Sequence, residues 1–316
     1  MAKKRIAITM GDPAGVGPEI IVKAFAQEDI YKICNPIVIG DKAVIKELIK
    51  VIGMDFDLDN IEMLNLNEIK NPSKLLKGTP SEESGRACFS YIRKAVELYR
   101  LGVVQAIVTC PITKVALKMA GLPWLGHTDM LAELTDTEDY AMAFYSEHLK
   151  VILVTIHVPL KEVPYLIKKE NVIKSICFAK KACDMLRIEN PRIAVCGLNP
   201  HAGEEGIIGR EEIEEITPAI KETKALGINV SGPYPSDSLF WRAYKGEFDM
   251  VVAMYHDQAL APFKLVAFDK GVNFTVGLPF IRTSPDHGTA YDIAWQGKAE
   301  PTSLLEAIKL AVRMEV

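Results

Sequence analysis

Short apolar segments that alternate with helical patterns constrain the fold of this chain more than any other feature of its sequence. Several of the segments are almost continuously apolar, which is typical of strands covered on both faces of a sheet. The predicted strands are residues 5–10, 36–40, 106–109, 151–157, 192–197, 249–254 and 273–277. Such an alternation predicts an α/β fold with largely parallel strands.

Helical patterns fill the intervals between these strands. Pro18 suits the first turn of a helix, and Thr79 with Glu82 has the capping-box spacing before a helix that ends near Arg100. The other predicted helices are residues 19–26, 114–120, 170–186, 211–225 and 303–312. A chain of 316 residues can bury more than one core, so we expect two domains. The middle domain, residues 126–269, is inserted between residues 1–125 and 270–316.

Composition excludes several classes of protein. The formal net charge of −4 argues against a nucleic-acid groove, which needs clustered basic residues. No apolar run reaches the roughly 18 residues of a membrane helix, and the first residues lack a signal-peptide pattern. The six cysteines form no C-x-x-C pair, which favours reduced thiols. We therefore expect a cytoplasmic enzyme with no membrane or nucleic-acid partner.

Three of the six histidines follow predicted strands, namely His157, His201 and His256. The carboxyl ends of strands in an open α/β sheet converge on the ligand crevice, so three imidazoles can meet there. Three neutral imidazoles suit a divalent metal and leave a coordination position open for substrate. Any one of these histidines alone could instead be an ordinary loop residue held by hydrogen bonds. The carboxylates nearby that could orient or extend such a site are Glu204, Glu205 and Asp257.

A second group of residues has the chemistry of an anion site. Arg282 directly follows an apolar stretch, and a guanidinium can hold a phosphate or carboxylate with two hydrogen bonds. Lys264 and Asn273 can add donors, although a solvated or salt-bridged lysine or arginine is the alternative. His127 and Thr128 lie ahead of a helix, where Thr128 or Asp129 could simply cap it.

The first loop, "GDPAGVGPE" (residues 11–19), matches neither standard nucleotide motif. A P-loop needs G-K-[ST], which does not follow. The dinucleotide fingerprint also fails, because Ile20 occupies the third glycine position. The loop is therefore not of the Rossmann type, and the residues alone leave its cofactor open.

Five motifs taken in order resemble one family. They are "GDPAGVGPE" (11–19), "GHTD" (126–129), "NPHAGE" (199–204), "YHDQ" (255–258) and "GLPFIRTSPDHGTA" (277–290). Together they resemble the 4-hydroxythreonine-4-phosphate dehydrogenases of vitamin B6 (pyridoxine) biosynthesis. The first and last also resemble the isocitrate/isopropylmalate dehydrogenases, whose NAD site lacks the Rossmann fingerprint. The resemblance implies two α/β/α domains of that kind, with "DHGTA" against the adenosine end of NAD.

The resemblance also implies site residues and partners. Family metal ligands match His157, His201 and His256, which in the family meet at a homodimer interface; the metal is zinc, magnesium or cobalt. Family substrate contacts match His127, Thr128, Lys264, Asn273 and Arg282. Candidate catalytic carboxylates are Asp237 and Asp257, and candidate cofactor contacts are His287, Gly288 and Thr289. The implied cofactor is NAD or NADP.

The implied reaction is a metal-assisted oxidation of the C3 hydroxyl of 4-phosphohydroxy-L-threonine, followed by decarboxylation to 3-amino-2-oxopropyl phosphate. Two departures bear on the substrate: Thr113 replaces the usual Asn or Ser, and Trp295 stands where many members carry glycine. Trp295 also resembles a sister group that acts on 4-phospho-D-threonate or 4-phospho-D-erythronate. A metal-dependent phosphohydrolase and an inactive metal-binding protein are alternatives from other classes.

Overall fold

The computed structural model describes residues 3–27 and 29–316, which form two compact units. Unit 1 lies within residues 1–138, 278–314 and 316, and unit 2 comprises residues 139–277 and 315. These edges differ from the predicted ones at 125/126 and 269/270. Helix α5 (His127–Leu134) packs on α3 (Glu82–Arg100) and so lies in unit 1. Strand β10 (Val272–Val276) pairs with β5 (Ala141–Tyr145) in unit 2.

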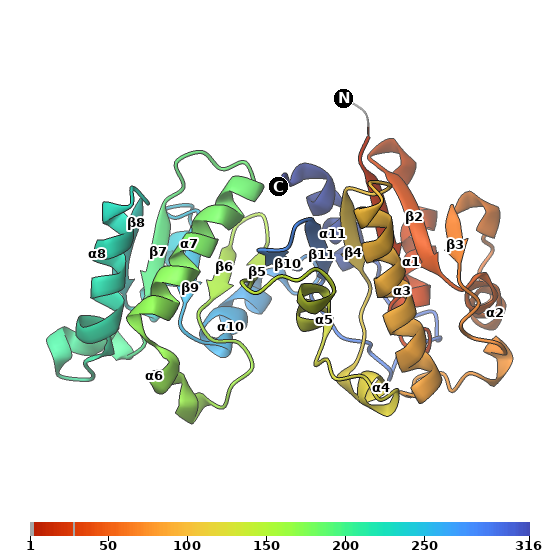
Figure 1. Cartoon of the computed structure of the whole chain (residues 1–316), viewed down its shortest axis with the longest axis horizontal. Helices are drawn as coiled ribbons and strands as arrows, with labels where there is room; N and C mark the ends of the chain where they lie inside the picture. The colour runs from red at the N-terminus through yellow and green to blue at the C-terminus, as the bar shows by residue number, and fades with distance from the viewer. Residues whose placement is uncertain (1–2, 28) are drawn as a thin grey trace. The chain divides into compact units, whose positions relative to one another are not determined.

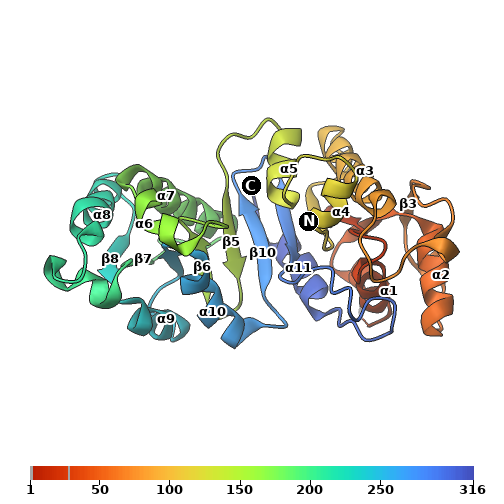
Figure 2. The same ribbon diagram turned by 90° about the horizontal axis from the view of Figure 1, so that it is seen from below.

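Unit 1 contains parallel strands in the order β3-β2-β1-β4-β11 (Figure 1). The strands are β1 (Arg5–Thr9), β2 (Asn35–Gly40), β3 (Met63–Asn65), β4 (Ala106–Thr109) and β11 (Ile281–Pro285). The remaining helices are α1 (Gly17–Gln27), α2 (Lys42–Ile52), α4 (Lys114–Met119) and α11 (Thr302–Arg313), with short turns at Ile30–Lys32, Leu58–Asn60 and Pro72–Lys74. Helix α3 lies on one face of these strands, and α1 and α11 lie on the other (Figure 2).

Unit 2 contains strands in the order β10-β5-β6-β9-β7-β8. Its remaining strands are β6 (Lys150–Leu153), β7 (Ile193–Cys196), β8 (Val230–Tyr234) and β9 (Met250–Ala253). The helices are α6 (Val163–Leu166), α7 (Lys169–Met185), α8 (Thr217–Ala225), α9 (Ser236–Tyr244) and α10 (His256–Ala267), with helical turns at Leu160–Glu162, Pro200–Gly206 and Glu212–Ile216. Helices α7 and α8 cover one face of the strands, and α9 and α10 cover the other (Figure 2). The α/β class is therefore confirmed.

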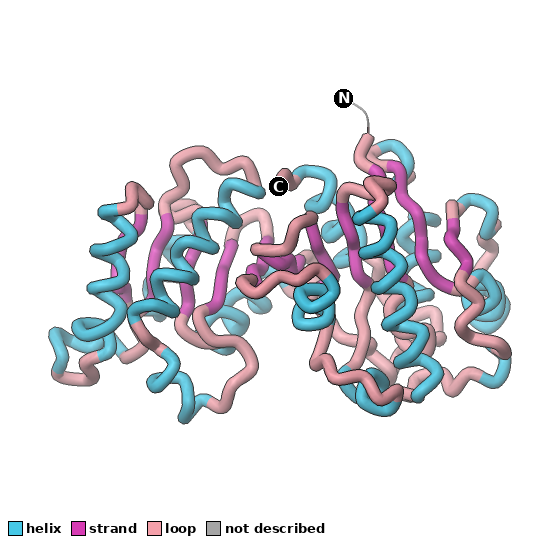
Figure 3. The backbone as a smooth tube through the Cα atoms, in the orientation of Figure 1, coloured by secondary structure: helices cyan, strands magenta, loops and turns pink. Residues whose placement is uncertain are grey.

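Strand pairing in unit 2 is mixed, which corrects the expectation of largely parallel strands for this part of the chain. Strand β5 is antiparallel to both β10 and β6, whereas the other pairs are parallel. The sequence pattern did not reveal β5, and β8 contains Gly232 and Pro233, residue types that argue against a strand. Strands β3 and β11 and helices α2, α9 and α10 were also not predicted (Figure 3).

All seven predicted strands are present, with small differences at their ends. The largest difference is in β6, which ends at Leu153, so His157 lies in the following loop. The capping box before α3 is formed by Ser81 and Ser84, not by Thr79 and Glu82. Each serine hydroxyl accepts a hydrogen bond from the other residue's backbone N–H, at 3.1 and 3.2 Å. Residues 211–225 begin with a π-helical turn rather than a uniform α-helix.

Buried strands place the cores of both units. In unit 1 the side chains of Ile6, Ala7 and Ile8 on β1 are inaccessible to solvent. In unit 2 an apolar cluster that includes Val151, Val251 and Phe263 packs β6 and β9 against α10. All six cysteines are free thiols, and only Cys177 is exposed. Within the described residues, no helix combines the length and apolarity needed to span a bilayer.

Candidate active site

The opening loop of unit 1 is held by a buried carboxylate. The Asp12 side chain accepts hydrogen bonds from the backbone N–H of Ala14 at 2.8 Å and from the Tyr291 hydroxyl at 2.6 Å. Burial, opposed by these hydrogen bonds, raises the pKa of Asp12 above its usual value. The backbone N–H of Val16 also donates to the Thr289 carbonyl at 3.0 Å. The "DHGTA" segment therefore lies directly beside the first loop.

Trp295 contributes to the same support. Its indole N–H donates to the Pro13 carbonyl at 3.0 Å, and the Lys77 ammonium lies 4.9 Å from the ring centre. The residue is buried and has a φ of 63°, a backbone conformation that glycine adopts most readily. The structure thus explains how tryptophan occupies a position suited to glycine: its hydrogen bond and burial offset the backbone strain.

Arg282, which is buried on β11, and the half-buried His127 form the anion-binding candidate of unit 1. Strand β11 lies beside β4, which carries Thr109. The Arg282 guanidinium donates to the Thr109 hydroxyl at 2.9 and 3.2 Å, and burial lowers the pKa of Arg282 to about 9. Burial, with a contribution from the Arg282 charge, holds the pKa of His127 well below its usual value. The Nε2 atom of His127 is buried and has no hydrogen-bond partner among the described residues. A neutral imidazole and a buried guanidinium thus lie together in a position that suits an anion.

The start of α5 tests the alternative that "GHTD" only caps a helix. Gly126 is the N-cap and, as a glycine, has no side chain with which to cap the helix. The Asp129 carboxylate accepts from the backbone N–H of Leu125, so Asp129 does support the turn. Thr128 is half-buried within the first turn of the helix. Asp129 therefore has the local structural role, which leaves His127 and Thr128 available for other contacts.

The remaining predicted substrate, cofactor and catalytic residues differ in their burial and contacts. Lys264 on α10 lies 5.7 Å from the Phe268 ring centre, and Asn273 is buried on β10. His287 is exposed, while Thr289 is buried. Asp237 lies in the first turn of α9, where its carboxylate accepts from the backbone N–H of Ser238 at 2.8 Å.

Two of the three strand-end histidines come together in unit 2. Strands β6 and β9 are parallel neighbours, and the ring centres of His157 and His256 lie 5.7 Å apart. Two imidazoles that share a cation through bonds of about 2.0–2.1 Å have ring centres roughly 5–6 Å apart, so this pair fits one ion. The Nδ1 atom of His256 lies 2.7 Å from an Asp257 carboxylate oxygen, an arrangement that orients metal-bound histidines.

His201 does not join this pair within one chain. No group of three histidine, cysteine or acidic side chains suited to a metal exists among the described residues. The side chain of His201 is 68% exposed and pairs with Glu204 at 3.2 Å. The strand-end argument that one chain gathers all three imidazoles is therefore wrong for the described residues, because His201 lies exposed in a left-handed loop after β7.

That loop has an unusual backbone. Four of its residues with side chains, His201, Ala202, Glu204 and Glu205, adopt left-handed conformations with φ between 46° and 55°, and Gly203 does so as well. A left-handed turn costs roughly 1–2 kcal/mol for each L-residue. Such strain persists only where the surrounding structure imposes it, and it clusters at functional sites.

A chain of buried hydrogen bonds connects the three loops that carry these histidines. The Thr155 hydroxyl donates to the Met254 carbonyl at 2.7 Å, and the Met254 N–H donates to the Gln258 side chain at 2.7 Å. The Gln258 amide then donates to the Gly197 carbonyl at 2.8 Å. Sequence reasoning missed Thr109, Thr155 and Gln258 because their partners are distant in sequence. The only signals were the place of Gln258 at the end of "YHDQ" and of Thr155 two residues before His157.

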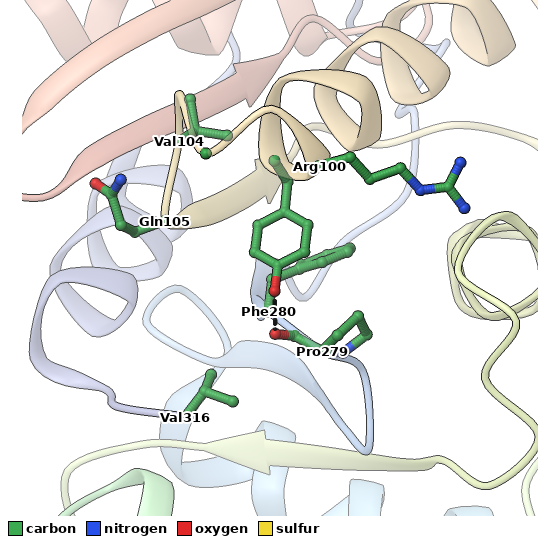
Figure 4. Close-up of a pocket in the computed structure, with 8 residues that line it drawn as sticks. Arg100, Val104, Gln105, Pro279, Phe280 and Val316 are labelled. Atoms are coloured by element: carbon green, nitrogen blue, oxygen red, sulfur yellow. Dashed lines mark hydrogen bonds between the residues drawn. The ribbon is translucent and has the colours of Figure 1, made fainter.

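Of two pockets on the molecule, one includes a candidate site residue and the other does not. A pocket of about 370 Å³ in unit 2 contains His157 together with Thr155, Asn171, Lys174 and Ser175. A pocket of about 440 Å³ in unit 1 lies where the chain enters β4, and it is lined in part by Arg100, Gln105 and Phe280 (Figure 4). This second pocket contains none of the predicted site residues. It lies at the N-terminal end of β4, whereas Thr109 is at the C-terminal end of that strand.

The fold defines the class, namely an α/β protein, which has the candidate anion site in unit 1 and the histidine pair in unit 2. Residues 32–311 match the family model described as "Pyridoxal phosphate biosynthetic protein PdxA". The chain belongs to this family and is an oxidoreductase of the dehydrogenase type.

Three relatives illustrate the match. A 4-hydroxythreonine-4-phosphate dehydrogenase of Desulforapulum autotrophicum is 45% identical, over 97% of this chain and 94% of that protein. A D-threonate 4-phosphate dehydrogenase of Salmonella typhimurium is also 45% identical, over 99% and 100%. A crystal structure of the 4-hydroxythreonine-4-phosphate dehydrogenase from Klebsiella pneumoniae is 41% identical, with a TM-score of 0.88 and 98% coverage of each chain.

Proposed function

We propose that this enzyme oxidises the C3 hydroxyl of 4-phosphohydroxy-L-threonine with NAD and releases CO₂, forming 3-amino-2-oxopropyl phosphate in vitamin B6 biosynthesis. The observation that carries the proposal is the buried Arg282 guanidinium together with the buried Nε2 atom of His127, whose chemistry suits an anion. It occurs in a chain 45% identical to a 4-hydroxythreonine-4-phosphate dehydrogenase over nearly its whole length. The substrate offers two anionic groups, a phosphate and a carboxylate.

The anion contacts follow from the chemistry of the side chains. Arg282 donates in two directions from a fixed guanidinium plane, which suits a phosphate or a carboxylate. We assign further contacts with these two anionic groups to His127, Thr128, Lys264 and Asn273. His127 acts as a neutral donor or acceptor, because its lowered pKa keeps the imidazole uncharged near neutral pH.

We assign a divalent cation (zinc, magnesium or cobalt) to His157 and His256 of one chain and His201 of a second copy. The close imidazole pair supports this assignment, and the absence of a third ligand within the described chain favours a homodimer. A bound divalent cation supplies Lewis acidity that lowers the pKa of a hydroxyl group. Asp257 orients His256 through Nδ1, so its role is that of a support. Asp237, which is exposed at the start of α9, is our candidate general base.

We assign NAD, or NADP, to the segment His287–Gly288–Thr289 beside the opening loop. A Cβ atom at Gly288 would meet no described atom within 4 Å, so a cofactor can approach the backbone there. Thr289 is held in place by the Val16 N–H, which gives the segment a fixed support. These residues position the cofactor, while hydride chemistry belongs to the nicotinamide itself.

A second candidate function is oxidation of 4-phospho-D-threonate or 4-phospho-D-erythronate. The Salmonella typhimurium relative, 45% identical over 99% of the chain, favours it, as does Trp295 beside the opening loop. The two substrates share the phosphate and carboxylate and differ in the substituent at C2. The same anion contacts therefore serve either substrate.

The deciding experiment mixes the full-length protein with NAD⁺, a divalent cation and each substrate in turn. NADH absorbance with phosphohydroxythreonine supports the main proposal, and NADH only with phosphothreonate supports the second. Release of inorganic phosphate without NADH would contradict both and indicate a hydrolase. The same assay with NADP⁺ assigns the cofactor.

The histidine assignment is tested by His201→Ala. Because this side chain is 68% exposed, we expect unchanged unfolding but a loss of turnover of about 10³-fold, or ~4 kcal/mol in the barrier. His148→Ala, the same change at an exposed histidine outside the candidate site, is the matched control. Equal activity in the two variants would contradict the assignment.

A further inference from the structure

We propose that Glu212 is a positioning residue for His201, and that its buried carboxylate sets the affinity of the enzyme for a divalent cation. The inference rests on the proposed function, which assigns His201 to that cation. It adds a residue that lies eleven positions along the chain, on another element, and carries no motif of its own.

Glu212 is only 3% exposed, although it is an acidic residue beside a surface loop. One carboxylate oxygen accepts from the backbone N–H of Leu198 at 2.8 Å and of Asn199 at 2.7 Å. The other oxygen accepts from the Asn199 side-chain amide at 3.0 Å. Three donors on one buried carboxylate satisfy the charge and fix the direction in which the chain leaves β7.

The carboxylate also touches the left-handed part of the loop. A Cβ atom on Gly203 would lie 2.6 Å from a Glu212 oxygen, so the backbone of Gly203 lies directly against the carboxylate. Gly197 is similarly close, because a Cβ there would lie 3.1 Å from the other oxygen and 2.8 Å from the Ala202 Cα. Glu212 therefore contacts the loop on both sides of His201.

These contacts give the strained turn an external support. The turn has its own bonds, such as the Ile208 N–H to the Gly203 carbonyl at 3.1 Å, which join residues within the loop. Glu212 adds a connection to a neighbouring element, because it is the first residue of the π-helical turn Glu212–Ile216. Such turns are uncommon and occur frequently at functional sites. A left-handed loop that presents an exposed histidine therefore depends on a buried carboxylate behind it.

The test measures Co²⁺ binding by titration of the full-length protein, with Glu212→Gln as the main variant. Glutamine keeps the shape but directs an N–H group at the donor of Asn199. We expect the dissociation constant for Co²⁺ to rise about 10-fold or more, as for other groups that orient metal ligands. At saturating Co²⁺ we expect most of the turnover number to return, which a purely structural defect would not produce.

Glu215→Gln is the matched control. Glu215 lies on the same π-helical turn, but its carboxylate accepts from the Lys169 N–H at 2.8 Å and so supports the start of α7 instead of the His201 loop. We expect its Co²⁺ affinity to equal that of the wild type. Glu212→Asp, which keeps the charge but shortens the reach, replaces the main variant if Glu212→Gln does not fold. We expect it to weaken binding as well.

Two results separate this inference from the proposed function. If His201→Ala binds Co²⁺ as tightly as the wild type, the metal role of His201 is wrong, and the role of Glu212 is wrong with it. If His201→Ala weakens binding but a folded Glu212→Gln or Glu212→Asp variant binds normally, only the inference about Glu212 is overturned. Urea unfolding of each variant verifies that the proteins compared are folded.

Discussion

The opening loop of unit 1 and the His201 loop of unit 2 share several structural features, but the first is buried and the second exposes a histidine. Each follows a buried parallel strand, contains several glycines and is tied by a buried carboxylate, Asp12 in one and Glu212 in the other. Residues 10–22 of the first loop and helix are all buried. In the second loop, His201 is exposed and its neighbours are left-handed.

The two loops differ in which residues adopt left-handed backbone conformations. In the opening loop, the left-handed position that contacts neighbouring backbone is occupied by Gly11, which adopts it without strain. In the His201 loop, residues with side chains occupy left-handed positions, and external contacts must hold them there. The first loop is buried and tightly packed, whereas the second presents the exposed His201 side chain. Substitutions in both loops test this difference, beginning with the one that should cost most.

Gly11→Ala should be the most destabilising change. Gly11 has a φ of +71°, and a Cβ atom there would lie 2.5 Å from the Pro111 carbonyl oxygen. Backbone strain and overpacking together should cost about 4 kcal/mol in the free energy of unfolding. Gly102→Ala is the matched control, because Gly102 has the same φ of +71° but no described atom within 4 Å of the added Cβ. It should cost only about 1 kcal/mol, and equal losses in urea unfolding would show that close packing is unimportant.

The Asp12 carboxyl should give the opening loop a pH dependence. Its pKa in the folded state is raised, mainly by burial, above the usual 3.8, so the folded state binds the proton more tightly than the unfolded state. The resulting stability is present below pH 3.8 and is lost as pH rises through the folded-state pKa. The loss amounts to about 1.4 kcal/mol for every pH unit that separates the pKa values of the folded and unfolded states.

Asp12→Asn removes this titration, so the wild type should lose stability relative to the variant across that window. Asp55→Asn, at an exposed position, controls for the loss of one charge. Unfolding free energies of the wild type and of Asp12→Asn, measured from pH 3 upward, should show the wild type losing stability relative to the variant. Parallel pH profiles for wild type and Asp12→Asn would refute the linkage.

Ala202→Gly should change the free energy of unfolding least, and whether it stabilises or destabilises the protein is the informative result. Ala202 has a φ of 53°, so glycine should relieve roughly 1–2 kcal/mol of strain and lose about half of that gain to backbone entropy. We expect a net stabilisation of roughly 0.5–1 kcal/mol. Ala182→Gly, within the right-handed helix α7, should instead destabilise by about 1 kcal/mol. A loss of stability in both variants would mean that the His201 loop is not strained.

Much of the fold could be predicted because its elements leave local patterns. The apolar runs of β1, β4 and β9 and the helix ending at Arg100 are visible in sequence windows of a few residues. Strands β5 and β8 were missed, because β5 is a short segment that contains Ala and Met, which favour helices, and β8 contains glycine and proline. The proximity of His157 and His256 could be expected from their strand-end positions, whereas the exclusion of His201 could not.

The amino-acid sequence alone was enough to establish that this chain is an α/β protein of the PdxA family, because periodic patterns and motifs are local properties. It also placed histidines after strands that prove to be neighbours. The packing of the folded chain was needed to show that Arg282 is buried and bonded to Thr109, that Gln258 bonds to the Gly197 carbonyl, and that the Glu212 carboxylate contacts a left-handed turn. These features depend on strand order and on contacts between distant segments. Burial and handedness arise from that packing, and no short stretch of sequence encodes them.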